Sequence, residues 1–240
     1  MKKIFILLLL LPGALWANTI VLVHGYDNHS NIWQATGIYQ RLITSFGRQH
    51  AVFAVELPNK QPVDIQARSL NEQLSNISRS TNQPIILVGH SNGGLVARYL
   101  LTKNTGVNIQ GLITIASPHL GSGAALVSHL FNNSSPFGLI TDILGPSHLK
   151  TSKILYSNTR RGSNFLRRLN SMPHPNLCYV SIIRKKGLLS NLVSAQDSQN
   201  MNNIPALKGQ SRILFSHDEH ALNHRDFGPI AQALEICIKP

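Results

Sequence analysis

The chain is poor in cysteine and in acidic residues. Its only two cysteines, Cys178 and Cys237, belong to no Cys-x-x-Cys pair and have no companion histidine pattern, which argues against a zinc site. Only 10 of the 240 residues are acidic, and their spacing does not match a calcium-binding loop. We therefore predict no metal and no cofactor.

Aromatic residues and long apolar runs are also scarce. Aromatics make up 6% of the chain, and the 22 basic residues are scattered without helix-turn-helix or zinc-finger spacing, which argues against a nucleic acid partner. The apolar run over residues 4–11 is too short to span a bilayer, and no later stretch is long enough. The net charge of +12 favours anionic partners such as an anionic membrane surface, with general solubility as the alternative.

The first 17 residues predict a secretory signal peptide. Lys2 and Lys3 precede the apolar run, and small residues typical of a cleavage region follow it: Pro12, Gly13, Ala14 and Ala17. An uncleaved anchor is the alternative. Cleavage leaves residues 18–240, with a net charge of +10 once the two lysines are removed. We expect an exported protein, periplasmic or secreted.

The exported chain alternates predicted strands and helices. Apolar runs predict strands at 19–23, 51–56, 85–89, 110–116, 178–184 and 211–216, and helical periodicity predicts helices at 62–80, 93–103 and 226–238. Such alternation is typical of an α/β fold, a parallel sheet with helices on both faces. No repeat or linker divides residues 18–240, which predicts a single domain.

The most informative segment is residues 85–94, where an apolar run breaks into Gly89-x-Ser91-x-Gly93. A buried strand followed at once by a tight turn and a helix can hold one serine exposed at the top of a sheet. The glycines let the helix pack close behind that turn. The segment therefore predicts that Ser91 is a nucleophile.

Three segments together resemble secreted bacterial lipases and esterases of the α/β-hydrolase superfamily. They are the Gly-His-Ser-Asn-Gly-Gly turn around Ser91, the His24-Gly25 turn after the first strand, and Ser-Pro-His-Leu-Gly-Ser at 117–122. They follow the family's order and cover most of residues 19–122. The resemblance implies an α/β-hydrolase fold and a serine ester hydrolase.

In this family the nucleophile is followed along the chain by an acid and then by a histidine after the last strand. His217, His220 and His224 all follow the predicted strand 211–216. The family's pattern of histidine, spacer and leucine before the final helix matches His220 best. His217 and His224 remain alternatives.

The acid is harder to place. The family's aspartate stands three residues before a valine, and here that position is Ser190. Asp197 is the only carboxylate in the loop after the strand at 178–184, so we predict it as the acid. Asp142 falls in a predicted lid. Asp218 and Glu219 lie too close in sequence to the histidine.

The resemblance also implies an oxyanion hole built from two backbone N–H groups. One belongs to Asn92, which follows the nucleophile, and the other to Tyr26 after the His24-Gly25 turn. We expect the His24 side chain to brace its loop rather than to take part in catalysis.

Two further expectations concern other parts of the chain. Residues 122–160 are apolar yet rich in turns, which predicts a lid, with a pair of ordinary packing helices as the alternative. Arg184, Lys185 and Lys186 predict a solvated basic loop that could also contact an anionic headgroup.

A disulfide between Cys178 and Cys237 is also predicted. In a parallel sheet Cys178 opens its strand on the edge away from the nucleophile. The final helix runs antiparallel to the last strand and returns Cys237 to that same edge.

The sequence therefore predicts an exported, monomeric serine carboxylester hydrolase that cleaves lipidic or other ester substrates through an acyl-enzyme on Ser91. A phospholipase or acyltransferase with the same catalytic residues is the first alternative. A catalytically inactive hydrolase fold that acts as a binding protein is the second.

Overall fold

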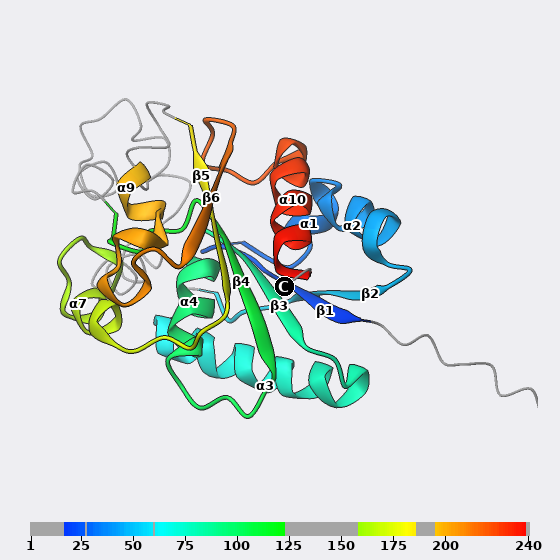
Figure 1. The fold of residues 1–240 in the computed structure, drawn as a ribbon, viewed down its shortest axis with the longest axis horizontal. Helices are drawn as coiled ribbons and strands as arrows, with labels where there is room; N and C mark the ends of the chain where they lie inside the picture. The colour runs from blue at the N-terminus through cyan, green and yellow to red at the C-terminus, as the bar shows by residue number, and fades with distance from the viewer. Residues whose placement is uncertain (1–16, 27, 60, 123–157, 186–194, 239–240) are drawn as a thin grey trace, which may run out of the picture.

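A six-stranded sheet forms the centre of the molecule in the computed structural model, which describes residues 17–26, 28–59, 61–122, 158–185 and 195–238. The strands are β1 (Asn18–Val23), β2 (His50–Val55), β3 (Ile85–His90), β4 (Ile109–Ile115), β5 (Cys178–Arg184) and β6 (Ser211–Ser216). Their order is β2-β1-β3-β4-β5-β6, and every neighbouring pair is parallel (Figure 1). The predicted α/β-hydrolase sheet is confirmed.

Helices cover both faces of the sheet (Figure 1). One face packs against α3 (Val63–Thr81), α4 (Asn92–Leu101) and α7 (Asn164–Ser171), and the other against α1 (Ile32–Ala35), α2 (Ile38–Phe46) and α10 (Phe227–Ile238). Short helices complete the described chain: α9 (Gln196–Gln199), η1 (Met201–Asn203), η2 (Pro205–Leu207) and η3 (His224–Asp226).

The pattern of the strands explains these two layers. Every residue of β1 and of β3 is buried, because these central strands are covered on both sides, and their sequences are therefore nearly continuous apolar runs. In α3 only one stripe is apolar, and Leu70 and Leu74 on that stripe are fully buried. Parallel strands bring all their carboxyl ends to one edge, where the loops after β1, β3, β5 and β6 meet.

All six predicted strands and the three predicted helices are present, with bounds that differ by at most two residues. The helices α1, α2 and α7 were not predicted. Most of the predicted signal peptide and lid lies outside the described residues, so both stay predictions. Within the described ranges, no helix is long and apolar enough to cross a membrane.

The structure contains the predicted disulfide. Cys178 at the start of β5 is bonded to Cys237 near the end of α10, with the two Cα atoms 5.4 Å apart. Ser91 follows the opposite, carboxyl end of β3. The bond therefore links the sheet to its last helix without touching the edge that carries the serine.

Replacing both cysteines by alanine is expected to destabilise the protein while sparing its chemistry. Opening a loop between positions 59 apart removes about 4 kcal/mol of stabilisation on the chain-entropy model. For a domain of this size that lowers Tm by roughly 8–16 °C. Thermal unfolding followed by circular dichroism gives the shift, and turnover per folded molecule well below Tm should match the wild type. An unchanged Tm would contradict the structural role.

Candidate active site

Ser91 stands at a strained turn between β3 and α4. Its backbone angles are φ 50° and ψ −123°, a conformation that residues other than glycine rarely adopt and that costs about 1–3 kcal/mol. The Ser91 N–H donates to the carbonyl of Ile115 at the end of β4 over 2.8 Å, which ties the turn to the sheet. The strain lifts the side chain out of the strand, as a nucleophile elbow requires.

The glycines of the motif allow α4 to pack against the sheet. A Cβ added at Gly93 would lie 2.2 Å from the carbonyl oxygen of His24, and one added at Gly89 would lie 2.5 Å from the Cα of Gly94. No side chain fits at either distance. The spacing Gly89-x-Ser91-x-Gly93 is thus a packing requirement of the turn.

One of the three candidate histidines reaches the serine. The Nε2 atom of His220 lies 3.0 Å from the Oγ of Ser91. His217 instead directs its Nε2 to a carboxylate oxygen of Asp226 over 3.1 Å, and His224 begins η3. The structure therefore brings Ser91 and His220 together, from loops 129 positions apart.

The imidazole of His220 is set to act as a base. If Nε2 accepts the hydroxyl proton of Ser91, the ring carries its own proton on Nδ1, and this buried atom has no hydrogen-bond partner among the described residues. Burial lowers the pKa of His220 to about 3, helped by the nearby His90 and Arg184 and opposed by Asp226. The ring is consequently neutral, and able to accept a proton, over the whole physiological range.

This electrostatic environment predicts activity that persists in mild acid. A base works only when unprotonated, so kcat/KM should fall only as pH drops through the pKa of the base in the free enzyme. With the pKa of His220 at about 3, kcat/KM should stay flat well below the ordinary imidazole value of 6.5. The measurement is an ester hydrolysis profile between pH 4 and 8, with circular dichroism at each pH as a control for unfolding. A midpoint near 6.5 would show that a carboxylate already faces the ring in the free enzyme.

The predicted oxyanion donors lie beside this pair. Asn92 is the first residue of α4, where backbone N–H groups have no partner within the helix. A Cβ added at Gly25 would lie 3.3 Å from the Cβ of Ser91, so the loop that carries Tyr26 passes directly against the serine. The N–H groups of Asn92 and Tyr26 remain our predicted oxyanion hole.

His24 braces that loop. Its Nε2 accepts the N–H of Leu57 over 2.9 Å, which leaves Nδ1–H to donate to the carbonyl of Gly25 over 2.8 Å. Burial lowers the pKa of His24 and keeps it neutral, as this hydrogen-bond pattern requires. The side chain thus fixes the turn whose backbone would face a substrate.

The structure does not place the predicted acid at the histidine. Asp197, in the first turn of α9, pairs with Arg161 over 2.5 Å, and both side chains are about half exposed. The neighbouring Gln196 donates to the carbonyl of Arg184, so the start of α9 does lie at the carboxyl end of β5. Asp142 and Ser190 fall outside the described residues.

Two charged residues near His220 were missed by the sequence reasoning. Arg184, expected in a solvated basic loop, is fully buried and forms an ion pair with Asp226, which is also fully buried. The expectation of a solvated Arg184 is therefore wrong. A signal for Asp226 was available, because Asn223-x-x-Asp226 forms a capping box at the start of η3.

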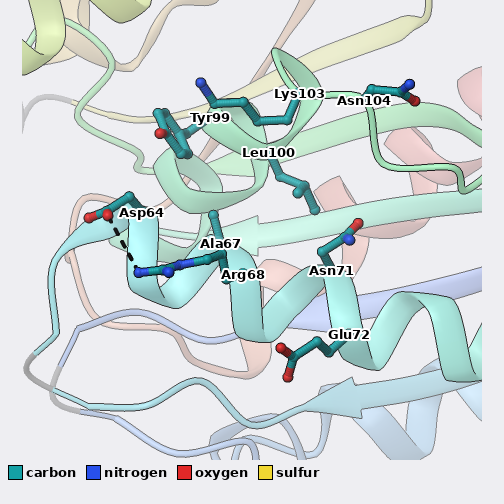
Figure 2. A pocket seen from close by; sticks show the side chains of 9 residues that line it. All are labelled: Asp64, Ala67, Arg68, Asn71, Glu72, Tyr99, Leu100, Lys103 and Asn104. Atoms are coloured by element: carbon teal, nitrogen blue, oxygen red, sulfur yellow. Dashed lines mark ion pairs between the residues drawn. The ribbon is translucent and has the colours of Figure 1, made fainter.

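The described residues contain no group of three histidine, cysteine or acidic side chains that could hold a metal ion. A groove of about 410 Å³ lies between α3 and α4, on the face shown in Figure 2. Its lining includes the exposed pair Asp64–Arg68, together with Tyr99 and Lys103, but neither Ser91 nor His220. This groove therefore takes no part in the site.

One family model matches the chain. Residues 19–176, more than half of the chain, match the model of the palmitoyl protein thioesterase family. None of the curated protein sequences compared with the chain matches it.

Several solved hydrolases have a similar structure. The mature lipase BlEst2 of Bacillus licheniformis superposes with a TM-score of 0.66 at 18% identity, over 90% of this chain and 91% of that one. A metagenomic carboxyl esterase superposes with a TM-score of 0.63 at 15% identity, over 93% of this chain and 76% of that one. The phospholipase PlaB of Legionella pneumophila superposes with a TM-score of 0.56 at 16% identity, over 78% of this chain and 46% of that one. At these identities the likeness shows the fold.

Proposed function

Because the chain belongs to the palmitoyl protein thioesterase family, within the α/β-hydrolase superfamily, we propose that it is a serine hydrolase of carboxylic esters. Ser91 is the nucleophile and His220 the base. The observation that carries the proposal is the 3.0 Å contact between Ser91 Oγ and His220 Nε2 at a strained elbow. A serine hydroxyl needs such a base to attack a carbonyl at neutral pH.

The chemistry proceeds in two halves. In the first, Ser91 Oγ bonds to the ester carbonyl carbon while its proton passes to His220 Nε2. The resulting oxyanion accepts hydrogen bonds from the N–H groups of Asn92 and Tyr26. The carbon–oxygen bond to the leaving group then breaks, and His220 returns the proton to the departing alkoxide. In the second half, water attacks the acyl-enzyme by the same route and releases the acid.

Asp197 completes the proposed triad. It is the carboxylate of the loop after β5, where the superfamily places its acid, and Arg161 holds it in the resting state. An exposed ion pair of this kind is worth less than about 1 kcal/mol. Breaking this ion pair is therefore inexpensive, and His220 Nδ1, which has no partner in the described part of the chain, is the atom that the freed carboxylate would bind.

We propose lipidic esters as substrates. The name of the family adds long-chain acyl thioesters to the candidates, and PlaB adds phospholipids. The net charge of +10 on residues 18–240 suits an anionic membrane surface, and the disulfide suits an exported, periplasmic or secreted enzyme.

The test is a substrate panel combined with active-site labelling. The panel contains p-nitrophenyl esters of increasing chain length, a palmitoyl thioester and phospholipids. A fluorophosphonate probe should label the wild type at Ser91 and leave Ser91→Ala unlabelled. A folded wild type that neither turns over any ester nor reacts with the probe would instead be a binding protein. His220 Nδ1 has no hydrogen-bond partner within the described ranges, and this favours that alternative.

A further inference from the structure

The main-chain carbonyl of His220 is held from two sides. It accepts a hydrogen bond from His90 Nε2 over 3.0 Å and another from Arg184 Nη2 over 3.3 Å. Burial and the charge of Arg184 lower the pKa of His90 to about 4, so its ring is neutral and donates from Nε2. Since His90 directly precedes Ser91, one of these bonds ties the base to the nucleophile's own strand.

The Arg184 side chain extends this anchor along the loop. Its Nη2 also donates to the carbonyl of Ala221 over 3.3 Å, and its Nη1 donates to Ser216 Oγ over 2.9 Å. Arg184 ends β5 and Ser216 ends β6, so the guanidinium joins two strand ends to the loop between β6 and η3. The side chains of Arg184 and Ser216 are buried, whereas Ala221 is exposed.

Asp226 holds the guanidinium in place. It pairs with Arg184 through both carboxylate oxygens, and it also accepts Ser216 Oγ over 2.7 Å and the N–H of Asn223 over 3.0 Å. The charge and hydrogen bonds of Arg184 outweigh the effect of burial and hold the pKa of Asp226 at about 2. The loop that carries His220 is thus fixed at both ends to one ion pair.

Stability alone gives little reason for such a pair. Burying two charges costs about as much as their attraction returns, and apolar residues of similar volume are often as stable or more so. What the Arg184–Asp226 pair does specifically is to fix the backbone of His220, from which the imidazole extends. The ring itself has no anchor on Nδ1 in the described residues.

We propose that Arg184 and Asp226 are positioning residues that hold the main chain of His220, so that its Nε2 faces Ser91 before any carboxylate reaches Nδ1. The inference rests on the proposed function and names the support of the same site. It assigns the two residues no contact with the substrate.

The experiment compares the wild type with two variants of the anchor and one control variant, by the rate of fluorophosphonate labelling and by kcat and KM for a short p-nitrophenyl ester. The double variant Arg184→Met/Asp226→Leu removes the anchor without leaving a buried charge unpaired. Labelling rate and kcat should both fall by about 10–100-fold, with KM changed less than about 3-fold, because a displacement of about 1 Å can cost 10²-fold. Arg68→Gln/Asp64→Asn removes the exposed ion pair drawn in Figure 2 and should match the wild type.

Arg184→Lys provides the second variant. Lysine keeps the charge opposite Asp226 but lacks the fork that reaches both the carboxylate and the carbonyl of His220, so its labelling rate should fall between the wild type and the double variant. If the double variant does not fold, the labelling rate of Arg184→Lys alone tests the positioning role. A folded double variant, or Arg184→Lys, that labels at the wild-type rate overturns the inference. A wild type that does not label at all overturns the proposed function instead.

Discussion

Ser91→Ala is expected to lower kcat by about 10⁴-fold or more while leaving the protein folded. The hydroxyl of Ser91 is the group in contact with His220 Nε2, and the alanine variant keeps the Cβ and the backbone of the elbow. Steady-state hydrolysis of a p-nitrophenyl ester measures the loss, with circular dichroism as the check on folding. Ser75→Ala, which removes a serine on α3 bonded to the carbonyl of Asn71, is the matched control and should keep full activity.

Ser91→Gly separates the chemistry from the strain. It should be as inactive as the alanine variant, yet at least as stable, because glycine adopts φ 50° without steric cost. Near-full esterase activity in either variant would remove Ser91 as the nucleophile and with it the proposed mechanism.

Asp197→Asn is expected to reduce kcat by about 10²–10⁴-fold with the fold intact. The amide that replaces the carboxylate carries no charge to stabilise the imidazolium of His220. The variant loses only an exposed ion pair with Arg161, worth less than about 1 kcal/mol, so Tm should barely change.

Arg161→Gln is the matched control for the acid. It breaks the same ion pair but keeps the carboxylate, so it should retain activity. If Asp197→Asn and Arg161→Gln are both as active as the wild type, Asp197 is not the acid. If Asp197→Asn keeps the wild-type kcat while Asp142→Asn loses most of it, Asp142 is the acid. The prediction of a lid at residues 122–160 would then also be wrong.

The sheet and the elbow could be predicted from the sequence because their causes are local. Central strands that are buried on both faces are nearly continuous apolar runs, and residues 85–89 are such a run. The glycines around Ser91 are required by contacts within the turn and by the strand beside it. The disulfide followed from the direction of parallel strands and of the last helix, which topology alone fixes.

The pairing of charges around the base could not be predicted in the same way. Arg184 looks like part of a solvated basic run, because its neighbours in sequence are lysines. Its burial depends on Asp226, 42 positions later, which supplies the countercharge inside the fold. Likewise Asp197 was chosen for its loop, whereas its resting partner, Arg161, lies 36 positions earlier.

The sequence by itself determined the sheet and the elbow, and it predicts the serine as the nucleophile, since periodicity and glycine stereochemistry act over a few residues. The resemblance favoured His220 and left two alternatives open, and only the tertiary structure shows which histidine meets Ser91. His217, His220 and His224 share one short loop and the same chemistry. The route of that loop past Arg184, Asp226 and His90 turns His220 alone toward the serine, because hydrogen bonds to its carbonyl come from strands distant in sequence.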